Sequence, residues 1–228
     1  MQHSTHAKSS LASVLFEAVR GKSVGRTLTN LFWHGTETLG GNILDIGGGG
    51  GRGSHYRFLP IEKSTRVQTV DVVARPDTNF VLDITKERVP LPDGSQNHNF
   101  LFNILEHLAN PETAAREAHR LLKEGGTLLG TVPFLVNVHP DPHDFTRFTS
   151  EALEALFTRT GFTIEEIAPI GRGPFLAAYE QLDMLIWNPL HLFFLPFIWS
   201  LDALLALLKP QRDFPSQFPL AYNFIVRR

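Results

Sequence analysis

The sequence predicts an α/β fold with a mostly parallel sheet, and three observations indicate it. Short apolar runs suited to buried strands alternate with segments of helical periodicity, an order typical of parallel sheets. The first apolar run, residues 43–46, leads directly into five consecutive glycines at residues 47–51. The next two runs each carry an acidic residue near the carboxyl end, Asp71 and Asp83. Ligands bind at that edge of an open α/β sheet, so the pattern predicts a binding site there.

The composition fits one α/β domain of ordinary size. The chain has 228 residues, of which 43% are hydrophobic, and this is ample material for a core. A net charge of −2 provides no basic field, so no nucleic-acid partner is expected. The absence of cysteine excludes disulfides, thiol nucleophiles and zinc–thiolate sites. The first ten residues are polar and show no secretory signal, so a cytoplasmic location is expected.

The glycine run is the segment on which the functional prediction rests. Glycines just past a strand let the chain turn sharply and bring backbone N–H groups close to a ligand. A flexible linker would have serine and polar neighbours, whereas here an Asn-Ile-Leu-Asp-Ile strand precedes the glycines. Gly48, Gly50 and Gly53 satisfy the dinucleotide spacing G-x-G-x-x-G, so a nicotinamide dehydrogenase is one interpretation. Residues 45–51 also fit acidic-apolar-G-x-G-x-G, which resembles the first motif of the class I S-adenosylmethionine-dependent methyltransferases.

Three later segments extend the resemblance to the group called methyltransferase type 11 and disfavour the dehydrogenase. In the order and spacing of that group, the chain contains Leu91-Pro92-Asp93-Gly94-Ser95, Leu105-Glu106-His107-Leu108 and Leu121-Leu122-Lys123-Glu124-Gly125-Gly126. The resemblance implies a Rossmann-like fold with a seven-stranded sheet, helices on both faces, and S-adenosylmethionine as cofactor. Asp71 would accept hydrogen bonds from both ribose hydroxyls, and the Asp83-Ile84 pair would lie beside the adenine. The expected cofactor-binding residues are Asp45, Gly47, Gly49, Gly51, Asp71, Val72, Asp83, Ile84 and Asn103.

The individual elements follow from local patterns. Apolar spacing predicts two N-terminal helices, near residues 11–19 and 28–33. One later helix should begin at Asn110-Pro111 and end at Gly125-Gly126, and Thr149 should start another that ends near residue 160. Residues 96–99, Gln-Asn-His-Asn, are polar, so the fourth strand is expected to be shortened. The expected strands are residues 43–46, 67–73, 80–84, 100–103, 127–132, 162–170 and 220–226.

The loop after the fifth strand, residues 133–149, carries the candidate catalytic residues His139, His143, Asp144 and Arg147. Three interpretations stay open. A histidine could be the general base for an acceptor hydroxyl, with Asp144 orienting it and Arg147 holding an anionic substrate. A metal could instead be bound, although two prolines constrain the convergence of its ligands, which would be His139, Asp141, His143 and Asp144. Alternatively, Asp144 and Arg147 hold the loop together. No metal site is assigned.

A long apolar insertion separates the last two strands. The chain is therefore divided into an N-terminal helical cap (1–40), a cofactor-binding core (41–170), the insertion (171–218) and a last strand (219–228). The segment 184–208 is long and apolar enough to cross a membrane. However, Pro189 and Pro196 should interrupt a helix there, and the chain must return to the sheet to form the last strand. Three roles stay open: a lid over the active site, contact with the inner membrane face, or a homodimer interface.

The sequence therefore predicts an S-adenosylmethionine-dependent methyltransferase that acts on a small-molecule acceptor. The apolar insertion favours an apolar or lipid-like hydroxyl compound, hence O-methylation, and peripheral contact with the inner membrane face. The alternative is a cofactor-binding protein without turnover, whose insertion mediates attachment to a membrane or subunit. Residues 96–99 depart from the group's usual pattern and keep that alternative open. Methyl transfer from an activated sulfonium needs mainly alignment, so the sequence does not identify the acceptor.

Overall fold

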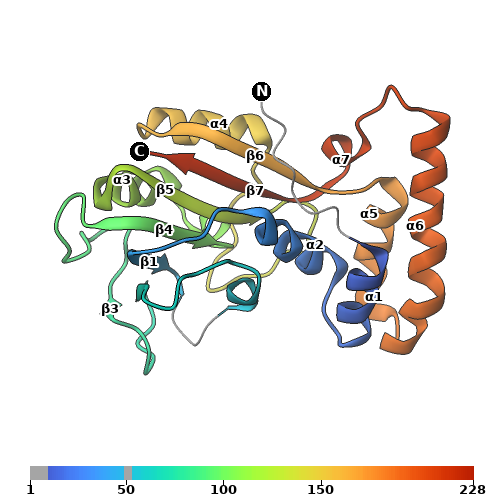
Figure 1. Ribbon diagram of the computed structural model, residues 1–228, viewed down its shortest axis with the longest axis horizontal. Coiled ribbons are helices and arrows are strands. Elements are labelled where there is room, and N and C mark those ends of the chain that lie inside the picture. Colours follow the sequence, from blue (N-terminus) through green and yellow to red (C-terminus); the bar gives the residue numbers. More distant parts are fainter. Residues whose placement is uncertain (1–9, 49–52) are drawn as a thin grey trace.

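The computed structural model describes residues 10–48 and 53–228, and its centre is a single seven-stranded sheet (Figure 1). The strand order is β3-β2-β1-β4-β5-β7-β6. Only β7 runs antiparallel to its neighbours, β5 and β6, and all other pairings are parallel. The predicted fold class is confirmed. The strands are β1 (Asn42–Ile46), β2 (Arg66–Asp71), β3 (Phe80–Val81), β4 (Gln96–Phe102), β5 (Leu122–Pro133), β6 (Thr163–Gly171) and β7 (Pro219–Arg227).

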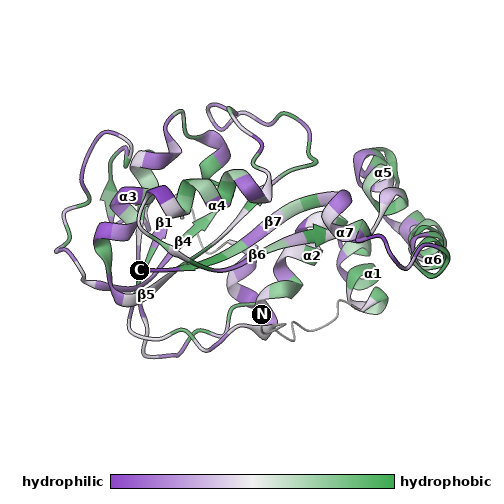
Figure 2. Ribbon diagram, turned by 90° about the horizontal axis from the view of Figure 1, so that it is seen from above, coloured by the Kyte–Doolittle hydropathy of each residue, from purple (hydrophilic) through white to green (hydrophobic). Residues whose placement is uncertain are grey.

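Helices cover both faces of the sheet, as Figure 2 shows from above. Alternate residues of a strand point to opposite faces, so two hydrophobic clusters form. Leu44 and Leu101 pack with residues of α3 and α4, whereas Ile43 and Phe100 pack with residues of α1, α2 and α5. The helices are α1 (Leu11–Val19), α2 (Val24–Phe32), α3 (Pro111–Leu121), α4 (Ser150–Arg159), α5 (Pro174–Leu182), α6 (His191–Leu208) and α7 (Phe214–Gln217).

The starts of α3 and α4 agree with their predictions, whereas the end of α3 does not. Thr149 accepts a hydrogen bond from the backbone N–H of Ala152 and caps α4. Pro111 is the first residue of α3, but the side chain of Asn110 makes no capping hydrogen bond. The prediction that Gly125-Gly126 ends α3 is wrong, because the chain passes directly from Leu121 into β5.

The prediction of a shortened fourth strand is also wrong, because β4 includes the polar residues 96–99. Several of their polar groups find partners on neighbouring elements, which offsets part of the penalty for burying them. The Asn99 side-chain amide donates to the Ala118 carbonyl of α3 at 2.8 Å. The Nδ1 atom of His98 lies 2.7 Å from the Thr127 hydroxyl oxygen on β5. A polar strand can therefore occupy the centre of the sheet.

The third strand is shorter than predicted, since β3 ends at Val81 rather than at residue 84. The N–H of Leu82 still donates to the Asp71 carbonyl at 3.0 Å. Asp83 then turns the chain, because its carboxylate accepts hydrogen bonds from the backbone N–H (3.0 Å) and the hydroxyl (2.6 Å) of Thr85.

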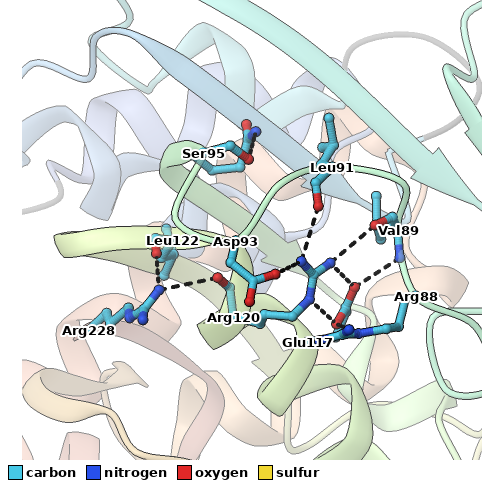
Figure 3. Close-up of polar contacts among 10 residues, drawn as sticks. Arg88, Val89, Leu91, Asp93, Ser95, Glu117, Arg120, Leu122 and Arg228 are labelled. Carbon is cyan, nitrogen blue, oxygen red and sulfur yellow. Dashed lines mark hydrogen bonds and ion pairs between the residues drawn. The ribbon is translucent and has the colours of Figure 1, made fainter.

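Arg120 of α3 holds the segment between β3 and β4 in place (Figure 3). Its guanidinium donates to the carbonyls of Val89 (3.1 Å) and Leu91 (3.0 Å) and forms ion pairs with Asp93 and Glu117. Glu117 also accepts a hydrogen bond from the N–H of Val89 at 2.9 Å. This network fixes the chain that leaves the carboxyl edge of β3.

The insertion forms two short 3-10 turns, Asp183–Leu185 and Asn188–Leu190, followed by the long helix α6. The prediction that prolines interrupt this helix is wrong for Pro196, which lies inside α6. Pro196 removes one backbone donor only, and its own carbonyl accepts a hydrogen bond from the Ser200 hydroxyl at 2.7 Å. Pro189 lies before the helix, in the second 3-10 turn. Figure 1 shows α6 at the edge of the molecule, with α1 and α5 beside it.

Candidate active site

A cavity of about 560 Å³ lies at the carboxyl edge of β1, β2 and β4. The predicted cofactor-binding residues converge there: the lining includes Gly47, Asp71, Val72, Asp83, Ile84 and Asn103. Asp45 is not part of the lining, and Gly49 and Gly51 lie outside the described residues. The cavity is closed on another side by Asp141, His143 and Phe145 of the loop after β5, residues 134–149. Strand ends distant in sequence therefore meet at one site.

Gly47 makes the turn out of β1 in a way that requires glycine. Its φ is 81°, in the left-handed region, and its N–H donates to the Val70 carbonyl at 2.7 Å. A Cβ atom at this position would lie 2.0 Å from Cδ1 of Ile104, which also lines the cavity. Because glycine has no side chain, backbone atoms of Gly47 form part of the cavity wall.

Two polar residues stand at the ends of β2 and β4. Asp71 is the last residue of β2, and its Oδ1 accepts a hydrogen bond from the N–H of Val73 at 2.9 Å. Asn103 follows β4 with a φ of 55°, uncommon for a residue with a side chain, while its N–H donates to the Thr131 carbonyl at 2.8 Å. A carboxylate and an amide are therefore placed on the same cavity.

Asp83 and Ile84 line the cavity beyond Asp71. One carboxylate oxygen of Asp83 serves the turn to Thr85, and the other forms an ion pair with Lys86 at 2.8 Å. Hydrogen bonds from Lys86 and Thr85 lower the pKa of Asp83 below its usual value. Asp83 is therefore an anion at neutral pH, and Ile84 adds an apolar wall.

Asp45 lies behind the cavity and supports the glycine turn. The Tyr56 hydroxyl donates to its Oδ2 at 2.7 Å, and a Cβ atom on Gly48 would lie 2.3 Å from the carboxylate. Burial raises the pKa of Asp45 to about 7, while the Tyr56 hydrogen bond lowers it and the negative charge of Asp71 raises it further. The sequence prediction placed Asp45 among the cofactor contacts, whereas in the structure its side chain is buried and is not part of the cavity lining.

Replacing Asp45 with asparagine is expected to change the pH dependence of stability. The pKa of Asp45, about 7 in the folded state, lies above the ordinary value of 3.8. Between these pH values the folded state binds more protons, so the free energy of unfolding falls as pH rises, by at most about 1.4 kcal/mol per unit. Asp45→Asn removes this contribution. Urea unfolding of both proteins at pH 4, 5.5 and 7 should show the variant gaining stability relative to wild type as pH rises; a constant difference contradicts the prediction.

In the loop after β5, Asp144 and Arg147 are bound to each other. The Arg147 guanidinium forms a two-atom ion pair with the Asp144 carboxylate and also donates to the Asn137 carbonyl at 3.4 Å. The same carboxylate accepts a hydrogen bond from the N–H of His139 at 2.9 Å. Arg147 holds the pKa of Asp144 well below its usual range. These contacts match the interpretation in which the pair holds the loop together, and a catalytic role for either residue stays a prediction.

His139 and His143 are separated by this loop geometry. His143 lines the cavity, and its backbone carbonyl accepts from Nδ1 of His107 at 2.6 Å. His139 instead faces Glu106, with Nε2 of His139 4.0 Å from Oε1 of Glu106. Of the four residues considered as metal ligands, His139 alone belongs to a group of converging ligand atoms within the described chain.

That group, the Glu-His-His cluster, comprises Glu106, His107 and His139, whose ligand atoms lie within 4.8 Å of one another. Glu106 and His107 come from the 3-10 turn Leu105–His107, directly after β4. Burial raises the pKa of Glu106 to about 8. The sequence prediction missed Glu106 and His107 as site residues. Their position just past a strand of the cofactor sheet was the available signal, but their proximity to His139 depends on the path of a distant loop.

Comparison with known proteins agrees with this geometry. Residues 44–130 match the methyltransferase type 11 family, described as a methyltransferase domain. A S-adenosylmethionine-dependent methyltransferase from Archaeoglobus fulgidus has a similar structure, with a TM-score of 0.55 at 16% identity over 98% of this chain and 97% of that one. A 1,6-didemethyltoxoflavin-N1-methyltransferase from Burkholderia thailandensis, solved with its substrate and S-adenosylhomocysteine, has a TM-score of 0.51 at 14% identity over 95% and 78% of the two chains.

The fold alone does not determine the reaction. The [4+2]-cyclase SpnF is also similar in structure, with a TM-score of 0.53 at 16% identity over 96% of this chain and 92% of that one. No curated protein sequence matches the chain. The family match covers the glycine turn and the ends of β2 and β4, which line the cavity. Residues 44–130 are thus a methyltransferase domain, and the whole chain has the fold of class I methyltransferases; together these findings support an enzyme that uses S-adenosylmethionine as its cofactor.

Proposed function

We propose that this enzyme transfers the methyl group of S-adenosylmethionine to an oxygen atom of an apolar or lipid-like hydroxyl compound at a membrane surface. The observation that carries the proposal is the exposed apolar face of α6. Bound S-adenosylmethionine supplies an activated methyl group, so the protein must mainly bind, align and exclude water.

The cavity residues support a defined placement of the cofactor. Asp71 and Ile84 both line the cavity, which supports a proposal in which the carboxylate accepts hydrogen bonds from the ribose hydroxyls and Ile84 contacts the adenine. The backbone of Gly47 admits close approach of the methionine portion, since no side chain intervenes. Val72 and Asn103 complete the lining between these points.

The acceptor side of the cavity combines proton-accepting and apolar groups. His143 and Phe145 come from the loop after β5 and face the residues that follow β4. A hydroxyl acceptor must lose its proton during methyl transfer, and an imidazole such as that of His143 is suited to take it. Phe145 gives the acceptor an apolar contact, which favours a substrate with hydrocarbon character.

In α6, polar side chains are buried and large apolar side chains are exposed, which is the reverse of the pattern in a typical surface helix. Its buried residues include the polar His191 and Asp202, and the Asp202 carboxylate accepts hydrogen bonds from the first backbone N–H groups of α5. Large apolar side chains occupy the outer face: Phe193, Phe197 and Leu207 are 75%, 61% and 78% exposed. Figure 2 shows this helix end-on at the edge of the molecule, coloured mainly as hydrophobic. A surface of this kind requires an apolar environment.

A lipid bilayer fits this surface as a peripheral partner. Residues Asn188–Leu208 form the one helical stretch, within the described residues, that is long and apolar enough to cross a membrane. Crossing is disfavoured because the chain returns through α7 to β7, which pairs with both β5 and β6. Basic residues flank both ends of the apolar face, Arg20 and Lys22 near the Asn188 turn and Lys209 and Arg212 after α6. They suit anionic headgroups, which are abundant on the inner membrane face.

Substitution of Phe193, Phe197 and Leu207 by serine is expected to abolish co-sedimentation with vesicles of mixed zwitterionic and anionic lipid. The loss follows from removing three apolar side chains from the outer face of α6. Affinity for S-adenosylmethionine, measured by calorimetry, should remain, because the cofactor cavity is built by other elements. Val81→Ser at the opposite edge of the sheet is the matched control, since Val81 is also exposed.

Methyl transfer to hydroxylated lipid-like acceptors, followed with radiolabelled cofactor, provides the second measurement. The wild type should methylate such acceptors in vesicles, and the triple variant should lose this activity. A wild-type dimer that the triple variant dissociates, with no vesicle binding by either protein, would replace the membrane proposal with a subunit interface.

A further inference from the structure

The Glu-His-His cluster contains a buried carboxylate that no hydrogen-bond donor satisfies. The Glu106 side chain is fully buried, and neither of its oxygens has a hydrogen-bond partner in the structure. Its Oε1 lies 3.7 Å from Nε2 of His107 and 4.0 Å from Nε2 of His139. The loop after β5 carries a guanidinium, that of Arg147, but this group is bound to Asp144. A buried carboxylate without a partner carries a large desolvation penalty, so its environment is incomplete.

The backbone determines which nitrogen of each histidine is free. Nδ1 of His107 lies 2.6 Å from the His143 carbonyl, and Nδ1 of His139 lies 2.9 Å from the Asn137 carbonyl. A carbonyl only accepts hydrogen bonds, so each Nδ1 must carry the hydrogen. In the neutral imidazole, Nε2 is then left with its lone pair. Both Nε2 atoms are the ones nearest to Glu106.

Two imidazole lone pairs and one carboxyl group therefore face one another, and a bound cation would displace the proton that Glu106 retains at neutral pH. We propose that Glu106, His107 and His139 bind a divalent transition-metal ion, for which Zn²⁺ is the best match. Two imidazoles and one carboxylate are a ligand set found in catalytic zinc sites, which keep a further position open. The carbonyl contacts at Nδ1 also correspond to the outer hydrogen bonds that usually orient metal-bound histidines.

The ligand atoms, all within 4.8 Å of one another, must draw closer to hold such an ion. Zinc–ligand bonds of about 2.1 Å place neighbouring ligand atoms of a tetrahedral site about 3.4 Å apart. The two measured separations exceed this by less than about 1 Å. Movement is possible because His139 lies on a loop and its side chain is 41% exposed, while Glu106 and His107 are held by the turn after β4.

The position of the cluster relates the ion to the methyl acceptor. His107 lines the cavity together with His143 and Phe145. An ion held by His107 thus borders the acceptor side, and a metal-bound hydroxyl loses its proton more readily than a free one. This role rests on the proposed O-methylation, whereas metal binding itself does not.

The direct test is metal binding by the full chain without an affinity tag. After treatment with a chelator, titration with Zn²⁺ by calorimetry should show one ion per chain, and Zn²⁺ should raise Tm. Glu106→Gln keeps the shape of the side chain but removes its negative charge. This variant should bind Zn²⁺ about 10- to 100-fold more weakly. His34→Ala removes an exposed imidazole elsewhere and should bind Zn²⁺ as the wild type does.

His139→Ala guards against a folding defect in Glu106→Gln, since residue 139 is on a loop. It should also lose Zn²⁺ affinity while retaining S-adenosylmethionine binding. With Co²⁺ in place of Zn²⁺, the wild type should show the visible absorption of a tetrahedral site, and both variants should lack it. Equal Zn²⁺ affinity in wild type and Glu106→Gln, or no stoichiometric binding by the wild type, overturns the proposal. Neither result depends on the identity of the methyl acceptor.

Discussion

Replacing Asp71 with alanine is expected to weaken S-adenosylmethionine binding by roughly 10²–10⁴-fold. Under the proposed ribose assignment, the variant loses two charge-assisted hydrogen bonds, each contributing about 1.5–3 kcal/mol. Every 1.4 kcal/mol is a factor of about ten in Kd. Asp71 is the last residue of β2 and lines the cavity, so its carboxylate is fixed by the strand rather than by a mobile loop. Calorimetry with S-adenosylmethionine measures the change directly.

Two further variants separate this effect from a change in the backbone or in net charge. Asp71→Asn retains an oxygen that can accept from the N–H of Val73, so it should keep the turn and show an intermediate loss. Glu124→Ala removes the same charge at an exposed position and should bind normally. A folded Asp71→Ala protein with unchanged affinity would refute the ribose assignment.

Arg120→Ala is expected to lower the free energy of unfolding by about 3–5 kcal/mol. The side chain of Arg120 is largely buried, and its removal takes the guanidinium from the buried carboxylate of Glu117 and the printed donor from the Leu91 carbonyl. The Val89 carbonyl loses one of its two hydrogen bonds and keeps the one from the N–H of Leu91. Urea denaturation monitored by circular dichroism gives the value. Arg120→Lys should not retain the wild-type stability, because a single ammonium cannot reproduce the several guanidinium contacts drawn in Figure 3.

Arg116→Ala is the matched control on the same helix. Arg116 pairs with Glu112 at the surface, where ion pairs contribute about 0–1 kcal/mol. The double variant Arg120→Ala/Glu117→Gln should recover part of the loss, since the buried carboxylate is removed and the charge left on Asp93 is exposed. Equal destabilisation by Arg116→Ala and Arg120→Ala would mean that the network around Arg120 does not support the fold.

The cofactor edge of the sheet is predictable from sequence because its signals are local. A strand followed by glycines and strands that end on Asp71 and Asp83 specify both the elements and the edge at which their side chains meet. The left-handed φ of Gly47 and its contact with Ile104 explain why glycine is needed there. For the same reason, the cavity lining agrees with most of the residues expected from the pattern.

The polar start of β4 and the helix through Pro196 were not predictable, because tertiary partners override local preference. Asn99 is acceptable in a central strand only because the Ala118 carbonyl of α3 is within reach. The Glu-His-His cluster has the same origin. The N–H of Phe145 donates to the Glu106 carbonyl at 2.8 Å, which brings the loop after β5 against the turn after β4. No spacing in the sequence encodes that contact.

The insertion between β6 and β7 leaves and rejoins the sheet at one place, since Gly171 pairs with Pro219. The entropy of closing such a segment grows slowly with its length, by about 0.6 kcal/mol for each doubling. Its length and surface can therefore diverge in evolution while the strand pairing stays the same. Leu176, Ala177 and Leu195 of this segment pack in the core, so exchanging only the exposed residues of α6 between related enzymes would vary the proposed membrane surface and leave the cofactor edge unchanged.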